Sequence, residues 1–152
     1  MSFIKIKFEK IFCKDWSIKF NTQRIIKLDF LKIAKEKKPT FSNSLLLFEL
    51  RNSKNKDCKI NLVLYVRPTD EQGQLIREKL ISILIDYPKL FHRYTSKGEK
   101  YLPIYKIEKF LDWSRKDMNQ IKMEFTFKLE DFIVSKLPEI EEYIEKVSVN
   151  FC

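Results

Sequence analysis

The sequence predicts a single α+β domain covering residues 1–152, in which a small antiparallel or mixed sheet packs against amphipathic helices and a long helix ends the chain. The length of 152 residues suits one domain. Hydrophobic residues make up 44% and charged residues 34%, which permits a packed core beneath a solvated surface. Segments with apolar residues at every second position are interspersed with segments at helical spacing, the pattern of an α+β fold.

The first part of the chain predicts two strands and a helix. Residues 4–8 and 16–20 place an apolar residue at every second position, which is typical of half-buried strands. The short turn between them predicts a β-hairpin. Residues 22–38 fit a helix better, because lysines crowd the end of this segment, where cations favour the helix dipole, and Pro39 lies just beyond.

The clearest strands are residues 44–51 and 59–67. The segment between them is polar and turn-forming, so the two strands are predicted to pair antiparallel. Residues 45–48 are continuously apolar, which indicates a central strand buried on both faces.

A helix is expected over residues 70–86. Thr69, with Gln72 three residues later, fits a capping box at its start, and Pro88 closes it. The apolar stripe of this helix is expected to contain Ile76, Leu80, Ile83 and Leu84.

The last third predicts an exposed loop over residues 90–98, an extended segment over 101–110 and a long final helix. Ser114 or Asp117 is the expected cap of that helix, and Pro138 marks a break or restart within it. The strongest periodic segments together predict one shared core, made of Leu46, Phe48, Leu62, Leu64, Ile76, Leu80, Ile83, Phe125 and Phe132.

Low residue counts exclude several classes of protein. Gly73 and Gly98 are the only glycines, so the Gly-rich phosphate loops of nucleotide enzymes have no place. A single histidine and three irregularly spaced cysteines give no support for a metal site or a disulfide framework. We therefore expect no cofactor, no metal and no enzymatic activity. The N-terminus lacks an apolar signal-peptide region and no run could span a bilayer, so the expected location is the cytoplasm, without a membrane partner.

The positive charge is concentrated in the first part of the chain. Residues 1–60 hold 15 Lys or Arg against 6 Asp or Glu, whereas residues 61–152 hold 15 of each. Within the second part, residues 89–116 are basic and residues 117–152 are acidic, with 8 negative against 4 positive side chains. This distribution predicts a basic pole and an acidic helical C-terminus.

The basic pole is the candidate site. Cations interleaved with aromatic side chains suit a nucleic acid, because the rings stack on bases and the cations follow the phosphates. The alternative is that the lysines are a solvated surface and that Phe91 and Tyr101 simply anchor the 90–98 loop. The candidate nucleic-acid-binding residues are Lys5, Lys7, Lys10, Lys14, Lys19, Arg51, Lys54, Arg93, Tyr94, Lys97 and Lys100.

Three functions remain open on this sequence. The first is a non-catalytic protein that binds RNA, DNA or a nucleoprotein, one form of which is an inhibitor from a phage or mobile element acting on a prokaryotic nucleic-acid-targeting machine. The second is a protein–protein module whose acidic C-terminal helix, over residues 140–147, would pair with itself or with a basic partner. The third is a metal-dependent nuclease, in which Glu49 and Asp57 would hold Mg²⁺ and Lys59 would steady the developing charge.

Overall fold

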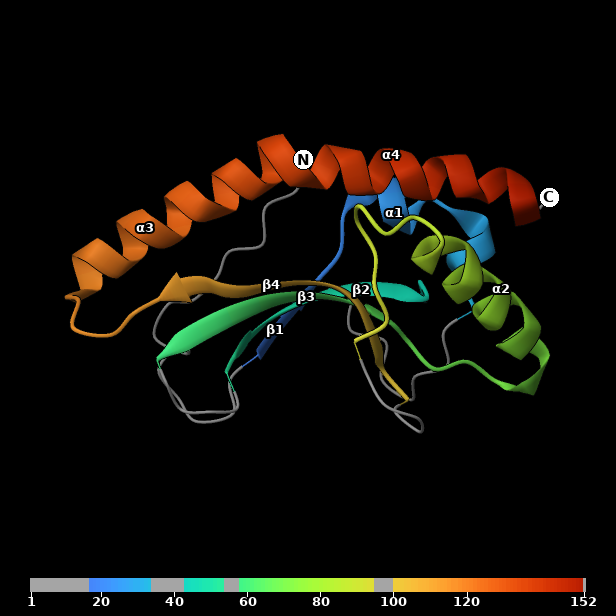
Figure 1. Ribbon diagram of the computed structural model, residues 1–152, viewed down its shortest axis with the longest axis horizontal. Helices are drawn as coiled ribbons and strands as arrows, with labels where there is room; N and C mark the ends of the chain where they lie inside the picture. Colours follow the sequence, from blue (N-terminus) through green and yellow to red (C-terminus); the bar gives the residue numbers. More distant parts are fainter. Residues whose placement is uncertain (1–16, 34–42, 54–57, 95–99, 152) are drawn as a thin grey trace.

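The computed structural model describes residues 17–33, 43–53, 58–94 and 100–151. The strands are β1 (Ser17–Phe20), β2 (Leu46–Asn52), β3 (Lys59–Val66) and β4 (Leu102–Asp112). The helices are α1 (Gln23–Ile26), α2 (Gln74–Ile85), α3 (Met118–Asp131) and α4 (Leu137–Val147). Figure 1 shows α3 and α4 as one long helix above the sheet, with α2 beyond one end of the sheet. The predicted α+β class and long C-terminal helix are confirmed.

The sheet is antiparallel throughout, in the order β1-β2-β3-β4. Each strand therefore pairs with the next described strand along the chain. Phe48 of β2 lies opposite Phe20 of β1 and Leu64 of β3. The predicted antiparallel pairing of residues 44–51 with 59–67 is confirmed. The hairpin partner expected at residues 4–8 lies outside the described residues.

The two faces of the sheet have different neighbours. Phe48 and Leu64 point into the main core under the helices, while Leu47 and Val63 alternate to the opposite face and are also buried. Burial on both faces of β2 was expected from the apolar run at 45–48. All the described helices lie on one side of the sheet or at its end (Figure 1). We call the other side, on which no described helix lies, the uncovered face, although Leu47, Val63 and Tyr65 are buried there.

Most of the predicted core is confirmed. Leu46, Phe48, Leu62, Leu64, Leu80, Phe125 and Phe132 belong to one cluster, and Ile83 packs at its margin. Within it, the Phe48 ring stacks on Phe20 with centroids 5.2 Å apart and meets the Phe132 ring edge-on at 6.1 Å.

Ile76 was assigned wrongly to this core. Helix α2 is rotated so that Arg77, Leu80, Ile81 and Leu84 are its buried residues. Arg77 faces inward because its guanidinium has two acceptors there: Nε donates to the Arg67 carbonyl at 2.9 Å and Nη2 to the Lys100 carbonyl at 3.1 Å. A buried arginine is tolerated when such bonds satisfy its donors.

The predicted helix over 22–38 is much shorter in its described part. Thr22 caps α1 by accepting from the Ile25 amide at 3.3 Å, but the helix ends after one turn. Leu28 is extended, and a short 3₁₀ turn follows at Asp29–Leu31. This break lets Ile25 and Leu31 both become fully buried. Packing therefore overrides the local helical pattern.

The start of α2 also differs from the prediction. Asp70, and not Thr69, is the capping residue: its carboxylate accepts from the Gly73 amide at 3.0 Å over a 3₁₀ turn at Glu71–Gly73. The Thr69 hydroxyl instead donates to the Ile33 carbonyl at 2.5 Å. A Cβ on residue 73 would collide with the Thr69 side chain, which explains a glycine there. Helix α2 proper begins at Gln74.

The long helix begins as predicted at Asp117. Its side chain accepts from the Gln120 amide at 2.9 Å, and the Gln120 side chain accepts from the Asp117 amide at 3.1 Å. A π-helical turn at Phe132–Lys136 joins α3 to α4, which begins at Leu137, one residue before Pro138. Pro138 therefore marks a restart, not a stop. None of the described helices is long and apolar enough to cross a membrane.

Candidate nucleic-acid interface

Five of the candidate binding residues are described by the structure, and they fall into two groups. Lys19 and Arg51 lie on the uncovered face of the sheet, while Arg93, Tyr94 and Lys100 flank the start of β4. The remaining candidates, Lys5, Lys7, Lys10, Lys14, Lys54 and Lys97, lie outside the described residues.

The first group forms part of a compact cluster on the uncovered face. The antiparallel register sets Lys19 of β1 opposite Glu49 of β2, and Arg51 follows two residues later on the same face. The Lys19 ammonium lies 5.6 Å from the ring centroid of Tyr101, and the Arg51 guanidinium lies 5.6 Å from that of Tyr65. The two rings meet edge-on at 6.2 Å. We call these five residues the sheet-face cluster.

Glu49 is the electrostatic centre of the sheet-face cluster. Its Oε1 lies 3.9 Å from Arg51 Nε and accepts from the Tyr65 hydroxyl at 3.5 Å. Burial raises the pKa of the Glu49 carboxyl above its ordinary value, while the charges of Arg51 and Lys19 and the Tyr65 hydroxyl act in the opposite direction. The two cations are therefore turned toward a carboxylate that is poorly solvated.

Arg51 has unused capacity to form hydrogen bonds. Its Nε is buried and makes no hydrogen bond, because 3.9 Å from Glu49 is too far for one. A buried donor without an acceptor costs free energy. An incoming oxygen that reached this nitrogen would remove that cost.

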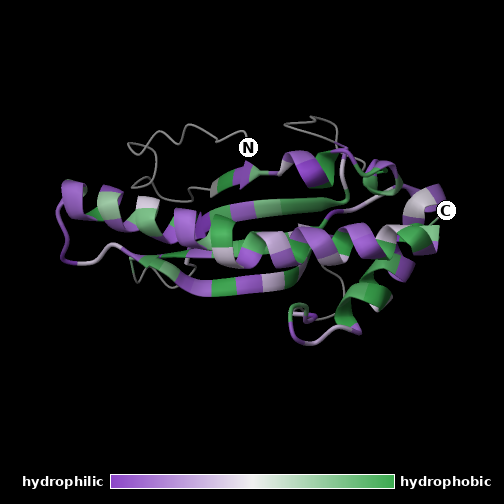
Figure 2. Ribbon diagram, turned by 90° about the horizontal axis from the view of Figure 1, so that it is seen from above, coloured by the Kyte–Doolittle hydropathy of each residue, from purple (hydrophilic) through white to green (hydrophobic). Residues whose placement is uncertain are grey.

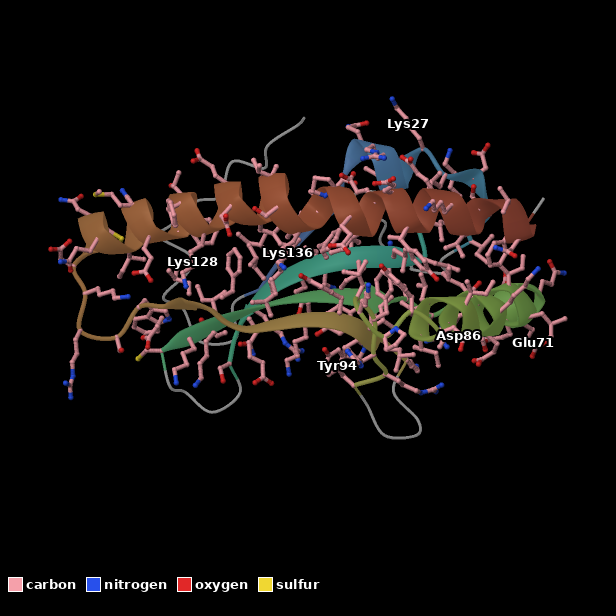
Figure 3. All side chains as sticks on the ribbon, turned by 45° about the horizontal axis from the view of Figure 1, so that its top comes forward. Lys27, Glu71, Asp86, Tyr94, Lys128 and Lys136 are labelled. Carbon is pink, nitrogen blue, oxygen red and sulfur yellow. The ribbon has the colours of Figure 1, made fainter. Side chains whose placement is uncertain are left out.

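The second group gathers at the beginning of β4. The amides of His92 and Tyr94 donate to the carbonyls of Ile104 and Pro103 at 2.9 and 3.2 Å, so this segment runs along the free edge of β4. Tyr94 is exposed and lies beside β4 in Figure 3. Although the residue as a whole is exposed, partial burial of its hydroxyl, and then the charge of Glu108, raises the pKa of Tyr94. The loop was expected to be exposed, and in its described part only Leu90 and Phe91 depart from this, since both are buried.

The anchoring interpretation is thus correct for Phe91, which is fully buried in the core. Tyr101 is half-buried, so neither the anchoring nor the binding interpretation describes it fully. Its ring contacts both the Lys19 ammonium and the Tyr65 ring. Lys100 is exposed, and its backbone is held by Arg77 through the bond to its carbonyl. Sequence reasoning missed Tyr65 and Arg77. The position of Tyr65 on the uncovered face could have been predicted, because it alternates with the inward Leu64 along β3. Nothing in the sequence of α2 indicates that Arg77 is buried.

The arrangement expected of a nuclease is not brought together among the described residues. Glu49 lies opposite Val63, and Lys59 is four residues further along β3, about 13 Å away at the usual rise per residue. Asp57 lies outside the described residues. In the part of the chain that the structure describes, no three His, Cys, Asp or Glu side chains are grouped so that they could hold a metal ion.

The apolar stripe of α4 is packed against the core of this same chain. Ile140, Ile144 and Val147, the stripe expected to support dimerisation, are buried against the rest of this chain. They are therefore not available to a second copy in this fold. Comparisons with protein-family models, with curated proteins and with solved structures found no match to this chain.

Proposed function

We propose that this protein is a non-catalytic binding protein, acting in the cytoplasm, that holds single-stranded nucleic acid across the uncovered face of its sheet. The observation that supports this most strongly is the sheet-face cluster. It combines two cations, two tyrosine rings and a buried arginine nitrogen without a hydrogen-bond partner on the side of the sheet where no described helix lies.

The chemistry of the cluster suits an unpaired strand. Lys19 and Arg51 would contact phosphate oxygens, and the buried Arg51 Nε would gain its missing acceptor. Tyr101 would offer a ring on which an unpaired base stacks. A sheet face has no helix to enter the major groove of a duplex, so single strands are preferred.

Glu49 would compete with a phosphate for the same cations. Its carboxylate lies 3.9 Å from Arg51 Nε and opposite Lys19, so a bound phosphate must displace it or share its partners. Removing the charge of Glu49 while keeping its shape should therefore strengthen binding. A surface whose lysines serve only solubility would show no such effect.

The test is a fluorescence-anisotropy titration with labelled single-stranded RNA, single-stranded DNA and duplex DNA. We expect Lys19→Ala with Arg51→Ala to weaken single-strand binding about tenfold or more, and Glu49→Gln to strengthen it by about threefold, since a hydrogen bond to a charged group contributes about 1.5–3 kcal/mol. The matched control is Lys128→Ala with Lys136→Ala, which removes the same charge from the long helix (Figure 3).

Salt provides a second measurement. If about four phosphates are neutralised, the slope of log affinity against log salt concentration should be about −3, because each phosphate of a single strand contributes roughly −0.7. Sequence preference should be weak, since Arg51 is the one arginine of the cluster.

The proposal fails if no single strand binds at low salt, or if the Lys128 and Lys136 control weakens binding as much as the Lys19 and Arg51 pair does. In the first case a nucleoprotein would become the expected partner. An inhibitor that occupies the nucleic-acid channel of a prokaryotic machine is the form of that alternative which the basic surface favours.

A further inference from the structure

An exposed apolar stripe runs along the outer side of the long helix. Met123, Phe127 and Val134 leave 74%, 71% and 76% of their surface exposed. Spacings of four and seven residues place side chains on one face of an α-helix. Val134 is the third residue of the π turn at Phe132–Lys136, where only part of that turn's offset has accumulated, so it stays on the side of Met123 and Phe127. The stripe spans about 16 Å at 1.5 Å per residue. Figure 2, seen from above, shows hydrophobic residues interleaved with hydrophilic ones along this helix.

The fold of this chain does not account for the stripe. The core contacts of α3 are made by Ile121 and Phe125, on the opposite side of the helix. Single exposed hydrophobic residues are ordinary on protein surfaces. Three at helical spacing on one face form a patch instead, and such patches are typical of interaction surfaces.

The charge beside the stripe is acidic and unpaired. Glu130 and Asp131 follow Phe127 by three and four residues, so they lie on the same face, between Phe127 and Val134. No described lysine or arginine forms an ion pair with either carboxylate, and Asp131 accepts a hydrogen bond from the Ser135 hydroxyl at 3.2 Å. Glu124, by contrast, is paired with Lys116 at 2.5 Å.

These carboxylates disfavour a second copy of this helix as the occupant. An antiparallel pair centred on the stripe would bring Glu130 and Asp131 of both copies within about two turns of the centre. Four carboxylates would then face one another with no described cation among them. Like charges in such positions oppose pairing.

We infer that this stripe docks an amphipathic helix from another protein, with apolar residues at matching spacing and lysine or arginine beside them. Apolar side chains would cover Met123, Phe127 and Val134, and the flanking cations would pair with Glu130 and Asp131. The stripe lies opposite the core contacts of α3, and Figure 1 shows α3 over the helix-covered side of the sheet, so this partner and a nucleic acid on the uncovered face would occupy opposite sides of the molecule.

The test uses the full chain and a synthetic helical peptide of about 18 residues, or five turns, with leucines on one face and lysines flanking them. A twin peptide carries glutamate in place of each lysine. We expect the lysine peptide to bind, and the glutamate peptide to bind at least about tenfold more weakly. Phe127→Ser with Val134→Ser, and separately Glu130→Lys with Asp131→Lys, should each weaken binding of the lysine peptide at least about tenfold.

Two control variants show whether binding depends on this stripe or on nonspecific hydrophobic and electrostatic contacts elsewhere on the surface. Leu75→Ser alters a residue that is 84% exposed on α2, away from the stripe. Glu139→Lys with Glu142→Lys makes the same change in net charge on α4, where both residues are exposed. Both should leave binding unchanged, and circular dichroism should show every variant folded.

Equal weakening by the controls would overturn the inference, as would equal binding of the two peptides or no binding of the lysine peptide. Sedimentation equilibrium adds a further check. A native dimer that Phe127→Ser with Val134→Ser converts to monomer would show that a second copy occupies the stripe, and would also overturn it.

Discussion

The two halves of the long helix are continuous in the chain and very different in what they bury. Helix α4 buries Leu137, Ile140, Glu141, Ile144 and Val147 along its 11 residues. Helix α3 buries only Ile121 and Phe125 along its 14 residues, and leaves Met123 and Phe127 exposed. One half therefore completes the core, whereas the other extends over the sheet with an apolar face still open.

Polar contacts strengthen the same difference. Glu141 of α4 accepts from the Thr22 hydroxyl at 2.7 Å, and Glu145 receives both Nε and Nη2 of Arg24 at 2.7 and 2.8 Å. These bonds tie α4 to α1. An amphipathic pattern therefore does not by itself determine whether its apolar face is buried within the chain.

The π turn between the halves keeps both of them oriented toward the core. Phe132 and Ile140 are eight residues apart, so in an uninterrupted α-helix their side chains would lie about 80° apart around the axis. A π turn takes up one extra residue, which offsets the helix by about 100°. Pro138 comes two residues after the end of this turn, and its missing amide cannot donate to an earlier carbonyl.

The largest expected effect comes from a deletion that rotates the apolar residues of α4 away from the core. Deleting Glu142, which is exposed, should rotate Ile144 and Val147 out of the core and cost more than about 5 kcal/mol, because two full side-chain burials are lost. Deleting Ser135 together with Pro138→Ala should convert the π turn to α-helix, keep both stripes in phase and cost less than about 2 kcal/mol. Urea unfolding measures both, with Pro138→Ala alone as the control; equal losses would show that the phase argument is wrong.

The next effect compares one side chain from each half. Ile144 is fully buried, so Ile144→Ala should lower the free energy of unfolding by about 2–5 kcal/mol. Phe127 is mostly exposed, so Phe127→Ala should change it by less than about 0.5 kcal/mol. Thermal and urea unfolding of the purified variants give the two values. A large loss for Phe127→Ala would mean that its ring is covered within the chain.

The smallest effect concerns the ion pair that ties α4 to α1. Hydrogen bonding from Arg24 lowers the pKa of Glu145 below its ordinary value. A depressed pKa in the folded state means that the stabilisation is present above the unfolded pKa, about 4.3, and is lost as the pH falls through the folded value. Both side chains are over a third exposed, so the gain should stay within about 0.2–1 kcal/mol.

The measurement is the urea midpoint of the native chain and of Glu145→Gln between pH 7 and pH 3. The native chain should be the more stable at pH 7, and the two midpoints should converge toward pH 3. A difference between the two proteins that grows as the pH falls would contradict the assigned role of Arg24.

Local sequence signals were sufficient for much of the fold. Alternation located residues 44–51 and 59–67, the polar segment between them indicated their antiparallel pairing, and Asp117 with Gln120 marked the start of the long helix. These features depend on side chains within a few positions of one another, so their physical causes are visible in a short window of the chain.

Tertiary contacts decided the rest. The rotation of α2 depends on the carbonyls of Arg67 and Lys100, which accept from Arg77, and no pattern inside the helix shows where those acceptors lie. The short α1 depends on space in the core for both Ile25 and Leu31. In each case a distant partner outweighed a local preference of a few tenths of a kcal/mol.

The candidate site shows the same division. Lys19 and Arg51 were predicted as binding residues from their charge alone. The alternation of side chains along a strand also predicts that residues two apart share a face. Only the pairing of β1, β2 and β3, with Tyr101 at the start of β4, brought these cations onto two tyrosine rings and around Glu49. Charge and periodicity are properties of the chain itself, whereas the distance between residues 19, 51, 65 and 101 exists only once the strands have paired.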